Sequence, residues 1–352
     1  MSDDYLEEEN IVSRLNLFEE TGSTDYQPLT EAVKEYVEFS LHPEKRIWTG
    51  VKEIDEATRG IAPGEFCQIN GFAHNGKTVL VIELILANEG RPCILFTPDE
   101  TRMAVLIKLA AAICSISAIE FERRIFDGDT EVIQQLNDVA ERFKELAVYD
   151  DSISLHTMDR AWESVVHTVG QPDYCIFDFS DLLDEDMEPA SKMRALKAWG
   201  KDKQVPFVCL VQSSKSAGGG GKAVTIESGS HDRGDVGTFI IGVRRKINML
   251  VDQVRVLEEK LENTQNPTMA DKLMDKIVDI KEDLIPRHRN TITVNLVKNK
   301  RPPMLKVDEI DFHLQQDTGR LVRIYKDAPE DEPPIPFSKS LTAKELLAER
   351  DA

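Results

Sequence analysis

The chain of 352 residues is short of cysteine, of long apolar runs and of any leader-like N-terminus. No stretch approaches the length of apolar sequence that crosses a bilayer. The first four residues, Met1-Ser2-Asp3-Asp4, lack the basic and apolar regions of a signal peptide. The five cysteines are scattered singly inside apolar runs, which predicts reduced core residues and a cytosolic protein. They are Cys67, Cys93, Cys114, Cys175 and Cys209.

Metal-ligand clusters and net positive charge are also missing. The seven histidines form no cluster with cysteine or carboxylate at metal-ligand spacing, so we expect no zinc site. A formal net charge of −20 argues against a general nucleic-acid coat, although it leaves room for a local basic channel. Much of the acidity lies near residues 3–9 and 327–332. These ends are either solvated tails or tails that compete with DNA for a basic groove.

The strongest motif present is the segment from Gly71 to Thr78, which fits the phosphate-binding loop pattern G-x-x-x-x-G-K-[ST]. A strand-like run, Phe66–Asn70, precedes it, and Val79–Ala87 is long enough for a buried helix. In this context the loop N–H groups and the helix N-terminus face a nucleotide's phosphates. Lys77 is expected to reach the β/γ-phosphates, and Thr78 to help hold Mg²⁺. The expected nucleotide-binding residues are Gly71, Phe72, Ala73, His74, Asn75, Gly76, Lys77 and Thr78. The alternative is a glycine-rich turn before an ordinary helix.

Strand candidates alternate with helical patterns from about residue 48 to residue 326. The early apolar runs, separated by helices, predict a parallel sheet covered on both faces, an α/β class of fold. The last three strands follow one another closely, which predicts an antiparallel extension at one end. The expected strands are Phe66–Asn70, Cys93–Thr97, Leu146–Asp150, Tyr174–Asp178, Phe207–Val211, Thr238–Gly242, Thr291–Val297, Val307–His313 and Leu321–Tyr325.

Residues 245–289 interrupt this alternation with two apolar stripes at helical spacing. The first is Ile247, Leu250, Val254, Leu257 and Leu261, and the second is Ala270, Leu273, Ile277, Ile280 and Leu284. A turn from Asn263 to Pro267 joins them, and Thr268 followed by Asp271 supplies an N-cap signal. The pattern predicts an inserted antiparallel helical hairpin. It is either a self-contained arm or a docking and assembly element.

The two ends are predicted to lie outside the core. Residues 1–47 form an acidic segment with one amphipathic helix that begins at Thr30 and ends near His42-Pro43. This helix either covers its own domain or reaches a neighbouring subunit. Residues 327–352 form a proline-rich acidic tail with a short helix that Thr342 and Glu345 cap. That tail is either a tether with a docking peptide or a frayed terminus.

Triphosphate hydrolysis needs an acid that holds the metal and a carboxylate that orients water. The run Tyr174–Asp178 is a buried strand that ends in a carboxylate, the Walker B arrangement, so Asp178 is expected at the Mg²⁺. The strand Cys93–Thr97, expected beside the P-loop strand, leads to Asp99 and Glu100. Either carboxylate is placed to polarise the attacking water, because one residue of register decides which faces the nucleotide. The alternative is an acidic N-cap for the next helix.

A glycine-lysine segment follows Gln212, whose amide is expected at the γ-phosphate. Four consecutive glycines cannot form a stable helix or strand, and flanking lysines suit a phosphodiester chain. The expected DNA-binding residues are Lys215, Gly218, Gly219, Gly220, Gly221 and Lys222. A passive linker is the alternative.

A basic cluster that includes Lys298, Lys300 and Arg301 ends the strand Thr291–Val297. It is either a surface charge run or a set of cations delivered into a neighbour's nucleotide site.

In this order, the motifs resemble the RecA-like ATPase domain of DnaB-type replicative helicases, over residues 48 to 325. The lead-in segment from Thr49 to Glu65, Asp150-Asp151, the Asp178 strand, Gln212 and Glu227–Ser230 carry the likeness. The resemblance implies a hexameric ring that hydrolyses ATP with Mg²⁺ at subunit interfaces and moves on single-stranded DNA in replication. It also implies that Lys300 or Arg301 is a finger acting in trans, with Lys298 beside it, and that the glycine-rich segment lines the channel.

The sequence departs from this family at both ends and in the middle. About 45 residues stand where the family has an N-terminal scaffold domain, and the hairpin is extra. This style is typical of phage-encoded proteins, which act in the bacterial cytoplasm. The alternatives are a RecA/RadA-like recombination or Holliday-junction ATPase and a regulatory or loader ATPase. The expected partners are single-stranded or forked DNA, further copies of the chain, and a replication or recombination protein at the hairpin or C-terminal peptide. No membrane partner is expected.

Overall fold

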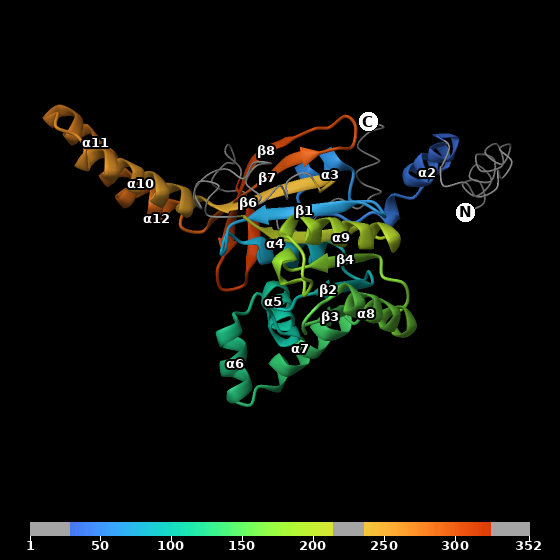
Figure 1. Cartoon of the computed structure of the whole chain (residues 1–352). Coiled ribbons are helices and arrows are strands. Elements are labelled where there is room, and N and C mark those ends of the chain that lie inside the picture. The colour runs from blue at the N-terminus through green and yellow to red at the C-terminus, as the bar shows by residue number, and fades with distance from the viewer. Residues whose placement is uncertain (1–28, 214–235, 325–352) are drawn as a thin grey trace, which may run out of the picture. The chain divides into compact units, whose positions relative to one another are not determined.

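The computed structural model describes residues 29–213 and 236–324 (Figure 1). The chain divides into two compact units, Met1–Lys45 and Arg46–Ala352. In the first unit, α2 (Leu29–Leu41) is followed by a short 3-10 helix, η1 (Pro43–Lys45). The predicted amphipathic helix is thus confirmed, and it ends one residue before His42. The predicted C-terminal helix lies outside the described residues.

The second unit is built on a sheet of nine strands in the described residues, in the order β3-β2-β4-β5-β1-β6-β7-β8-β9 (Figure 1). Each strand lies within a few residues of a predicted one. The strands are β1 (Phe66–Gly71), β2 (Cys93–Phe96), β3 (Leu146–Tyr149), β4 (Tyr174–Phe177), β5 (Phe207–Gln212), β6 (Phe239–Arg245), β7 (Thr291–Asn299), β8 (Val307–Gln315) and β9 (Arg320–Arg323).

The sheet has a parallel part and an antiparallel part. Strands β1 to β6 pair in parallel, whereas β7, β8 and β9 add in antiparallel order beyond β6. Both features confirm the predicted fold class. One expectation is wrong: β2 does not lie beside the P-loop strand β1, because β4 and β5 separate them. After β1 the chain forms β2 and then the edge strand β3, and it returns toward β1 through β4 and β5.

Alternation along the parallel strands creates two hydrophobic cores, one on each face. In β2, for example, Cys93 and Leu95 face one core while Ile94 and Phe96 face the other. One core is covered by α3 (Lys52–Thr58), α4 (Lys77–Ala87), α5 (Arg102–Cys114), α6 (Ala118–Phe126) and α7 (Thr130–Arg142). The other is covered by α8 (Leu155–Thr168) and α9 (Pro189–Asp202), and the short 3-10 helix η2 (Ser180–Leu182) lies between them in sequence. This two-sided cover is what continuous apolar strands require.

The predicted hairpin is present between β6 and β7. It consists of α10 (Lys246–Glu262), α11 (Pro267–Asp279), a π-helical turn η6 (Ile280–Leu284) and α12 (Ile285–Arg287). Its helices share a small core of their own, made of Leu250, Val254, Ile277 and Ile280. The N-cap of α11 is Asn266 and not the predicted Thr268, because Pro267 occupies the first helical position, where no N–H is needed.

Helices α5 and α6 are the most membrane-like part of the described chain. No single helix among the described residues has both the length and the hydrophobicity to cross a bilayer. This pair passes the same test jointly, with a bend of 96° between its members. Five residues of α5, Val105, Leu109, Ala110, Ala111 and Ala112, are buried in the protein.

Candidate functional site

The carboxyl ends of the parallel strands bring several of the predicted site residues to one edge of the sheet, whereas Lys300 and Arg301 follow β7 at the opposite edge. The P-loop follows β1, Asp178 follows β4, Gln212 ends β5, and Glu100 lies in the loop after β2. Because these strands run in the same direction, their carboxyl ends meet at the same edge, where α/β proteins bind ligands. The sheet thus assembles groups that are far apart in sequence.

The P-loop owes its path to two glycines. Gly76 is the N-cap of α4 at φ +92°, and a Cβ there would lie 2.5 Å from Cδ1 of Ile292. A Cβ on Gly71 would lie 2.6 Å from the carbonyl oxygen of Val243. Both positions therefore require glycine, because the loop packs directly against β6 and β7. Within the loop Phe72 is buried, whereas Ala73 and His74 are exposed.

Lys77 lies inside the curve of this loop. Its Nζ donates hydrogen bonds to the carbonyl oxygens of Gly71 (2.8 Å) and Phe72 (2.9 Å). Burial lowers the pKa of Lys77 to about 8, against the opposing effect of the nearby carboxylates Asp178 and Asp181. A desolvated ammonium held only by carbonyl oxygens gains strongly from an anion. The loop is therefore prepared to receive phosphate.

Thr78 and Asp178 meet beside Lys77. The Thr78 hydroxyl donates to Oδ2 of Asp178 at 3.3 Å, so the structure brings together the two residues that the sequence assigns to the metal. Burial raises the pKa of Asp178 to about 6, and the negative charge of Glu100 adds to the rise. A hydroxyl and a carboxylate at this spacing are oxygen donors of the kind Mg²⁺ prefers. These two residues therefore fit a magnesium ion and would hold it through their oxygens.

Glu100 and Asp99 occupy different environments. Asp99 is exposed, whereas Glu100 is partly buried, with its side chain 25% exposed. Glu100 forms an ion pair with Lys108 of α5, and both charges act on Asp178. Of the two predicted carboxylates, Glu100 is the one whose charge acts on Asp178. Lys108 was missed from the sequence, although a lone lysine within the apolar run Ala104–Ala112 was a signal.

Gln212 links the P-loop to the glycine-lysine segment. It lies opposite Gly71 in the β1–β5 register, and the next residue, Ser213, donates its N–H to the Gly71 carbonyl at 3.2 Å. The amide therefore lies at the same sheet edge as Lys77. The predicted DNA-binding residues, Lys215, Gly218, Gly219, Gly220, Gly221 and Lys222, lie outside the described residues.

The basic cluster divides into an inward and an outward cation. The Arg301 guanidinium pairs with Glu65, donates to the carbonyl oxygens of Thr58 and Gly60, and lies 5.1 Å from the ring centre of Phe239. Only 10% of its side chain is exposed. Lys300 is exposed at the end of β7. The Arg301 side chain is thus buried, whereas Lys300 is exposed.

An apolar pocket of about 270 Å³ adjoins the P-loop. It is formed by the start of α4, by α5 and by the turn between β8 and β9. Its lining includes Thr78, Val79, Ile107, Lys108 and Gly319. The pocket therefore opens beside both the P-loop threonine and the partner of Glu100.

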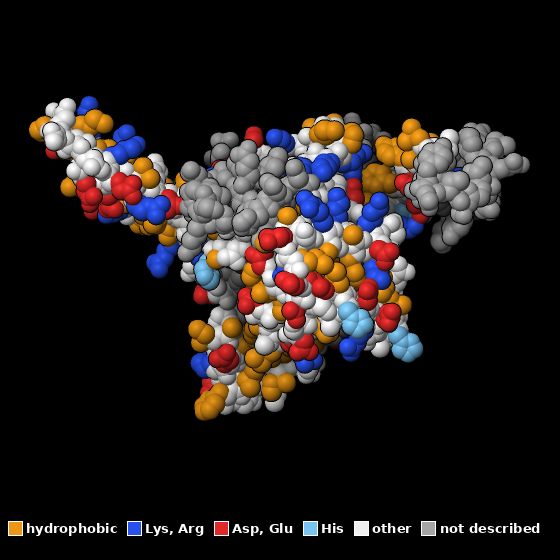
Figure 2. Space-filling model, viewed as in Figure 1, with side chains coloured by type: hydrophobic (Ala, Val, Ile, Leu, Met, Phe, Trp, Pro, Cys, Tyr) orange, Lys and Arg blue, Asp and Glu red, His pale blue; other side chains and the backbone are white. Residues whose placement is uncertain are grey.

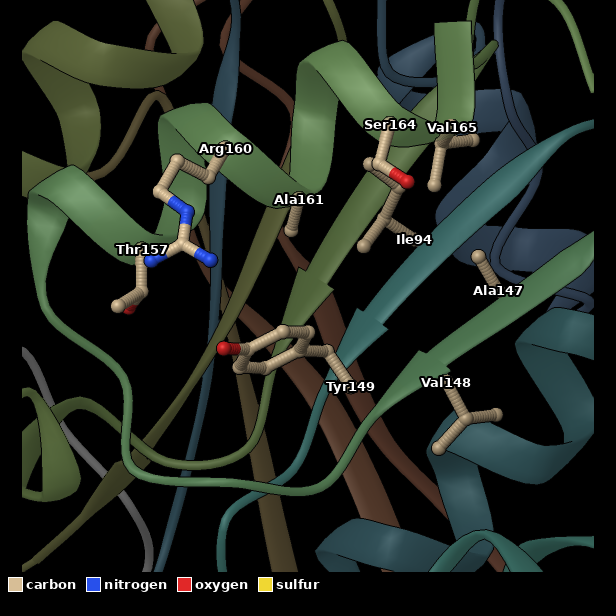
Figure 3. Close-up of a pocket in the computed structure, with 9 residues that line it drawn as sticks. All are labelled: Ile94, Ala147, Val148, Tyr149, Thr157, Arg160, Ala161, Ser164 and Val165. Carbon is tan, nitrogen blue, oxygen red and sulfur yellow. The ribbon is translucent and has the colours of Figure 1, made fainter. Parts of the chain in front are cut away.

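A second pocket of about 290 Å³ lies at the other end of the parallel part, between the edge strand β3 and α8 (Figure 3). Figure 3 shows the Arg160 guanidinium over this pocket, with the Tyr149 hydroxyl below it. Its lining contains none of the predicted site residues. It is separate from the edge that carries Lys77 and Asp178.

Comparisons with known proteins agree with this arrangement. Residues 47–222, half of the chain, match the family model of the DnaB-like helicase C-terminal domain. The chain is 26% identical over 211 residues to the replicative DNA helicase DnaB of Leifsonia xyli subsp. xyli (strain CTCB07), an alignment that covers 54% of this chain and 45% of that protein. The chain therefore spans about half the length of this curated relative.

Two solved structures share the fold. The first is an isolated ATPase domain, which superposes with a TM-score of 0.62 at 14% identity, covering 86% of this chain and 100% of that one. The second is a DnaB-like replicative helicase, studied with its interactions with primase, which superposes with a TM-score of 0.59 at 15% identity, covering 92% and 75%. Together with the family match, these findings identify a RecA-like core. The chain belongs to the DnaB-like helicase C-terminal domain family, whose members hydrolyse ATP.

Proposed function

We propose that this chain is a DNA-dependent ATPase of helicase type that couples ATP hydrolysis to movement on single-stranded DNA in replication. The observation that carries the proposal is the convergence of Lys77, Thr78 and Asp178 at one sheet edge within a chain of this family. The family match favours this function over the recombination and regulatory alternatives. Action in the cytoplasm stays a prediction.

ATP with Mg²⁺ is the proposed substrate complex. Thr78 and Asp178 would supply oxygen ligands to the metal, and Lys77 would exchange its two carbonyl partners for phosphate oxygens. When bound, such an ion would neutralise charge on the phosphates. The apolar pocket between α4, α5 and the β8–β9 turn has the place and character to hold the nucleotide base, since it opens beside Thr78.

Glu100 is the proposed water-orienting carboxylate. Its ion pair with Lys108 keeps the side chain in one orientation near Asp178. A carboxylate that is held in position is suited to accept a hydrogen bond from the attacking water. Asp99 is exposed and lacks a comparable position. Gln212, at the end of β5, is proposed to contact the γ-phosphate and to pass its loss to the following segment.

A neighbouring subunit is proposed to complete the site. Lys300 is exposed, so it is the cation that a second copy of the chain can present to the γ-phosphate, with Lys298 beside it. Closed rings place such a residue in each neighbour's site by symmetry. We therefore expect a hexameric ring on single-stranded or forked DNA, with the glycine-lysine segment of residues 213–222 facing the strand.

Exposed apolar side chains provide surfaces for this assembly. Phe126 and Ile119 of α6 are 90% and 79% exposed, and Figure 2 shows hydrophobic side chains gathered over this region. In the first unit, Tyr36 of α2 is 63% exposed. Large exposed apolar side chains that cluster mark interaction sites.

A replication or recombination protein is the proposed occupant of the hairpin or the C-terminal peptide.

ATPase and strand-displacement assays on forked DNA test the proposal. We expect hydrolysis that single-stranded DNA stimulates, and its loss in Lys77→Ala. Lys144→Ala is the matched control, because this lysine is 63% exposed on another face and only pairs with Glu141. Hydrolysis that no DNA stimulates would contradict a DNA motor. Electron microscopy with ATP and DNA distinguishes a closed ring from the open filament of a recombinase.

A further inference from the structure

The helical hairpin contacts the P-loop directly through its root, residues 244–248, where β6 runs into α10. Asn248, the third residue of α10, donates its Nδ2 to Oδ1 of Asn75 at 2.6 Å. Asn75 is fully buried, and among the described residues its own Nδ2 has no hydrogen-bond partner. A residue of the insertion thus fixes the orientation of a P-loop amide whose remaining donor is unused.

The same root is anchored to the sheet on its other side. Arg244, at the end of β6, pairs with Glu309 of β8. Lys246, at the start of α10, pairs with Asp311 of β8 at 2.8 Å. Residues 244, 246 and 248 therefore hold two carboxylates of β8 and one amide of the P-loop. A shift of the P-loop relative to β8 must strain or rotate this root.

Backbone packing leaves the P-loop little room to move independently. Its first glycine, Gly71, lies against the Val243 carbonyl of β6, and Gly76 lies against Ile292 of β7. Strand β6 leads into the hairpin and β7 leads out of it (Figure 1). The loop that is expected to hold the phosphates thus lies against both strands that carry the hairpin.

We propose that Asn248 is a positioning residue for Asn75, and that through this contact nucleotide occupancy and hairpin position are coupled. The inference rests on the proposed nucleotide binding and extends it to a second part of the molecule. With its oxygen held by Asn248, the Asn75 amide keeps its free N–H groups inside the loop, where a phosphate oxygen is the available acceptor. By linkage, if bound nucleotide changes the affinity of the hairpin for a partner by some factor, that partner changes the nucleotide affinity by the same factor.

The first test is the affinity for a fluorescent ATP analogue with Mg²⁺. Asn248→Ala is expected to weaken binding by about two- to tenfold, since it removes one hydrogen bond to a buried group. Asn263→Ala is the matched control, because its exposed amide only donates to Glu259 at the other end of α10. The control is expected to bind like the wild type. In hydrolysis, KM is expected to rise in Asn248→Ala while kcat changes little.

A double-mutant cycle separates positioning from a general loss of structure. In an Asn75→Ala background, Asn248→Ala is expected to add no further effect, because the two side chains act through one contact. An equal effect in both backgrounds, or wild-type affinity in Asn248→Ala, would overturn the proposal. Thermal unfolding of each variant reports whether its fold is intact.

Hydrogen exchange tests the coupling itself. In the wild type, the ATP analogue is expected to slow amide exchange in the P-loop and also in the first turns of α10. In Asn248→Ala the P-loop response persists and the α10 response is lost. The same α10 response in both proteins, or none in the wild type, contradicts the coupling. Absence of any binding by the wild type contradicts the proposed function, which is a distinguishable result.

Discussion

The parallel and antiparallel parts of the sheet use charged side chains in opposite ways. Burial shifts the pKa values of charged groups in both parts, but in the parallel part Lys77 is held by two carbonyl oxygens and Asp178 by the Thr78 hydroxyl. In the antiparallel part, Arg320 and Arg301 are held by the carboxylates of Glu83 and Glu65. The first pattern is typical of a binding site and the second of a structural clamp.

This difference shows that the ion pairs of the antiparallel part have a structural role. The clamps tie the antiparallel strands to the elements that carry the site: Arg320 of β9 reaches Glu83 of the P-loop helix α4, while Arg301 reaches the residue just before β1. Arg320 thereby supports the helix that begins at Lys77, whereas the Arg301 clamp lies at the amino end of β1, opposite to the P-loop. Removing a clamp should therefore cost stability, whereas removing an edge residue should cost activity.

Lys300 is the strongest test of this difference between the two parts of the sheet. It belongs to the antiparallel part, but it is proposed to take part in ATP hydrolysis. We expect Lys300→Ala to lower ATPase activity by about 10³-fold or more, as loss of a trans cation does. We expect Arg301→Ala to lose stability instead, because it leaves Glu65 buried without its partner. ATPase rates and melting temperatures of both variants check the pair.

Mixing variants shows whether Lys300 acts in a neighbour. Lys77→Ala fails in its own site and Lys300→Ala fails in the adjacent one. In mixed rings about a quarter of the interfaces then combine an intact Lys77 with an intact Lys300. Recovered activity supports action in trans. If mixtures stay as inactive as the separate variants, Lys300 does not complete a neighbour's site.

Within the parallel part, Glu100 and Asp99 form a matched pair. Glu100→Gln is expected to lower kcat by about 10²- to 10⁴-fold, the effect of losing a positioned base, while nucleotide affinity changes little. Asp99→Asn makes the same chemical change one residue away on an exposed side chain and should retain most activity. Single-turnover hydrolysis measures the chemical step. A larger loss of kcat in Asp99→Asn would show that Asp99, and not Glu100, orients the attacking water.

Much of the fold was predictable because its signals are local. Strands such as Phe207–Gln212 are buried on both faces and are therefore continuous apolar runs. The P-loop is likewise a contiguous motif, so Lys77 and Thr78 follow from sequence alone. Asp178 could also be predicted from the sequence, because a carboxylate at the end of a buried strand has few other roles in a chain that contains a P-loop earlier in its sequence.

The remainder depends on contacts between distant residues. Sequence order suggests β2 as the neighbour of β1, but pairing places β4 and β5 between them. Arg301 and Lys300 are adjacent in sequence, and Arg301 turns inward toward groups that are distant in sequence, among them Glu65, 236 residues away. The bond between Asn248 and Asn75 spans 173 residues and has no local signal.

The Arg320–Glu83 clamp is expected to be the largest stability effect. Glu83 is fully buried, and Arg320 and the Leu321 N–H both donate to its Oε1. Arg320→Ala leaves that carboxylate without its cation and should lower the free energy of unfolding by about 3–5 kcal/mol. Arg142→Ala breaks a comparable pair with Glu89 at the surface and should have a small effect. Urea unfolding measures both, and equal losses would contradict the clamp.

Substitution of Asp311 is expected to have the smallest effect on stability, and this effect should depend on pH. Burial acts to raise the pKa of Asp311, but hydrogen bonds from Lys246 and Thr293 outweigh it and hold this pKa below its ordinary value of 3.8. Because the folded pKa is the lower one, the stabilisation is complete above pH 3.8 and is lost as pH falls through the folded value. Asp311→Asn should therefore cost about 1 kcal/mol at neutral pH, the scale of one hydrogen-bonded pair. In urea unfolding, the gap between variant and wild type should narrow as pH falls below 3.8. A gap that stays constant across this range would show that the Asp311 charge does not anchor the hairpin root.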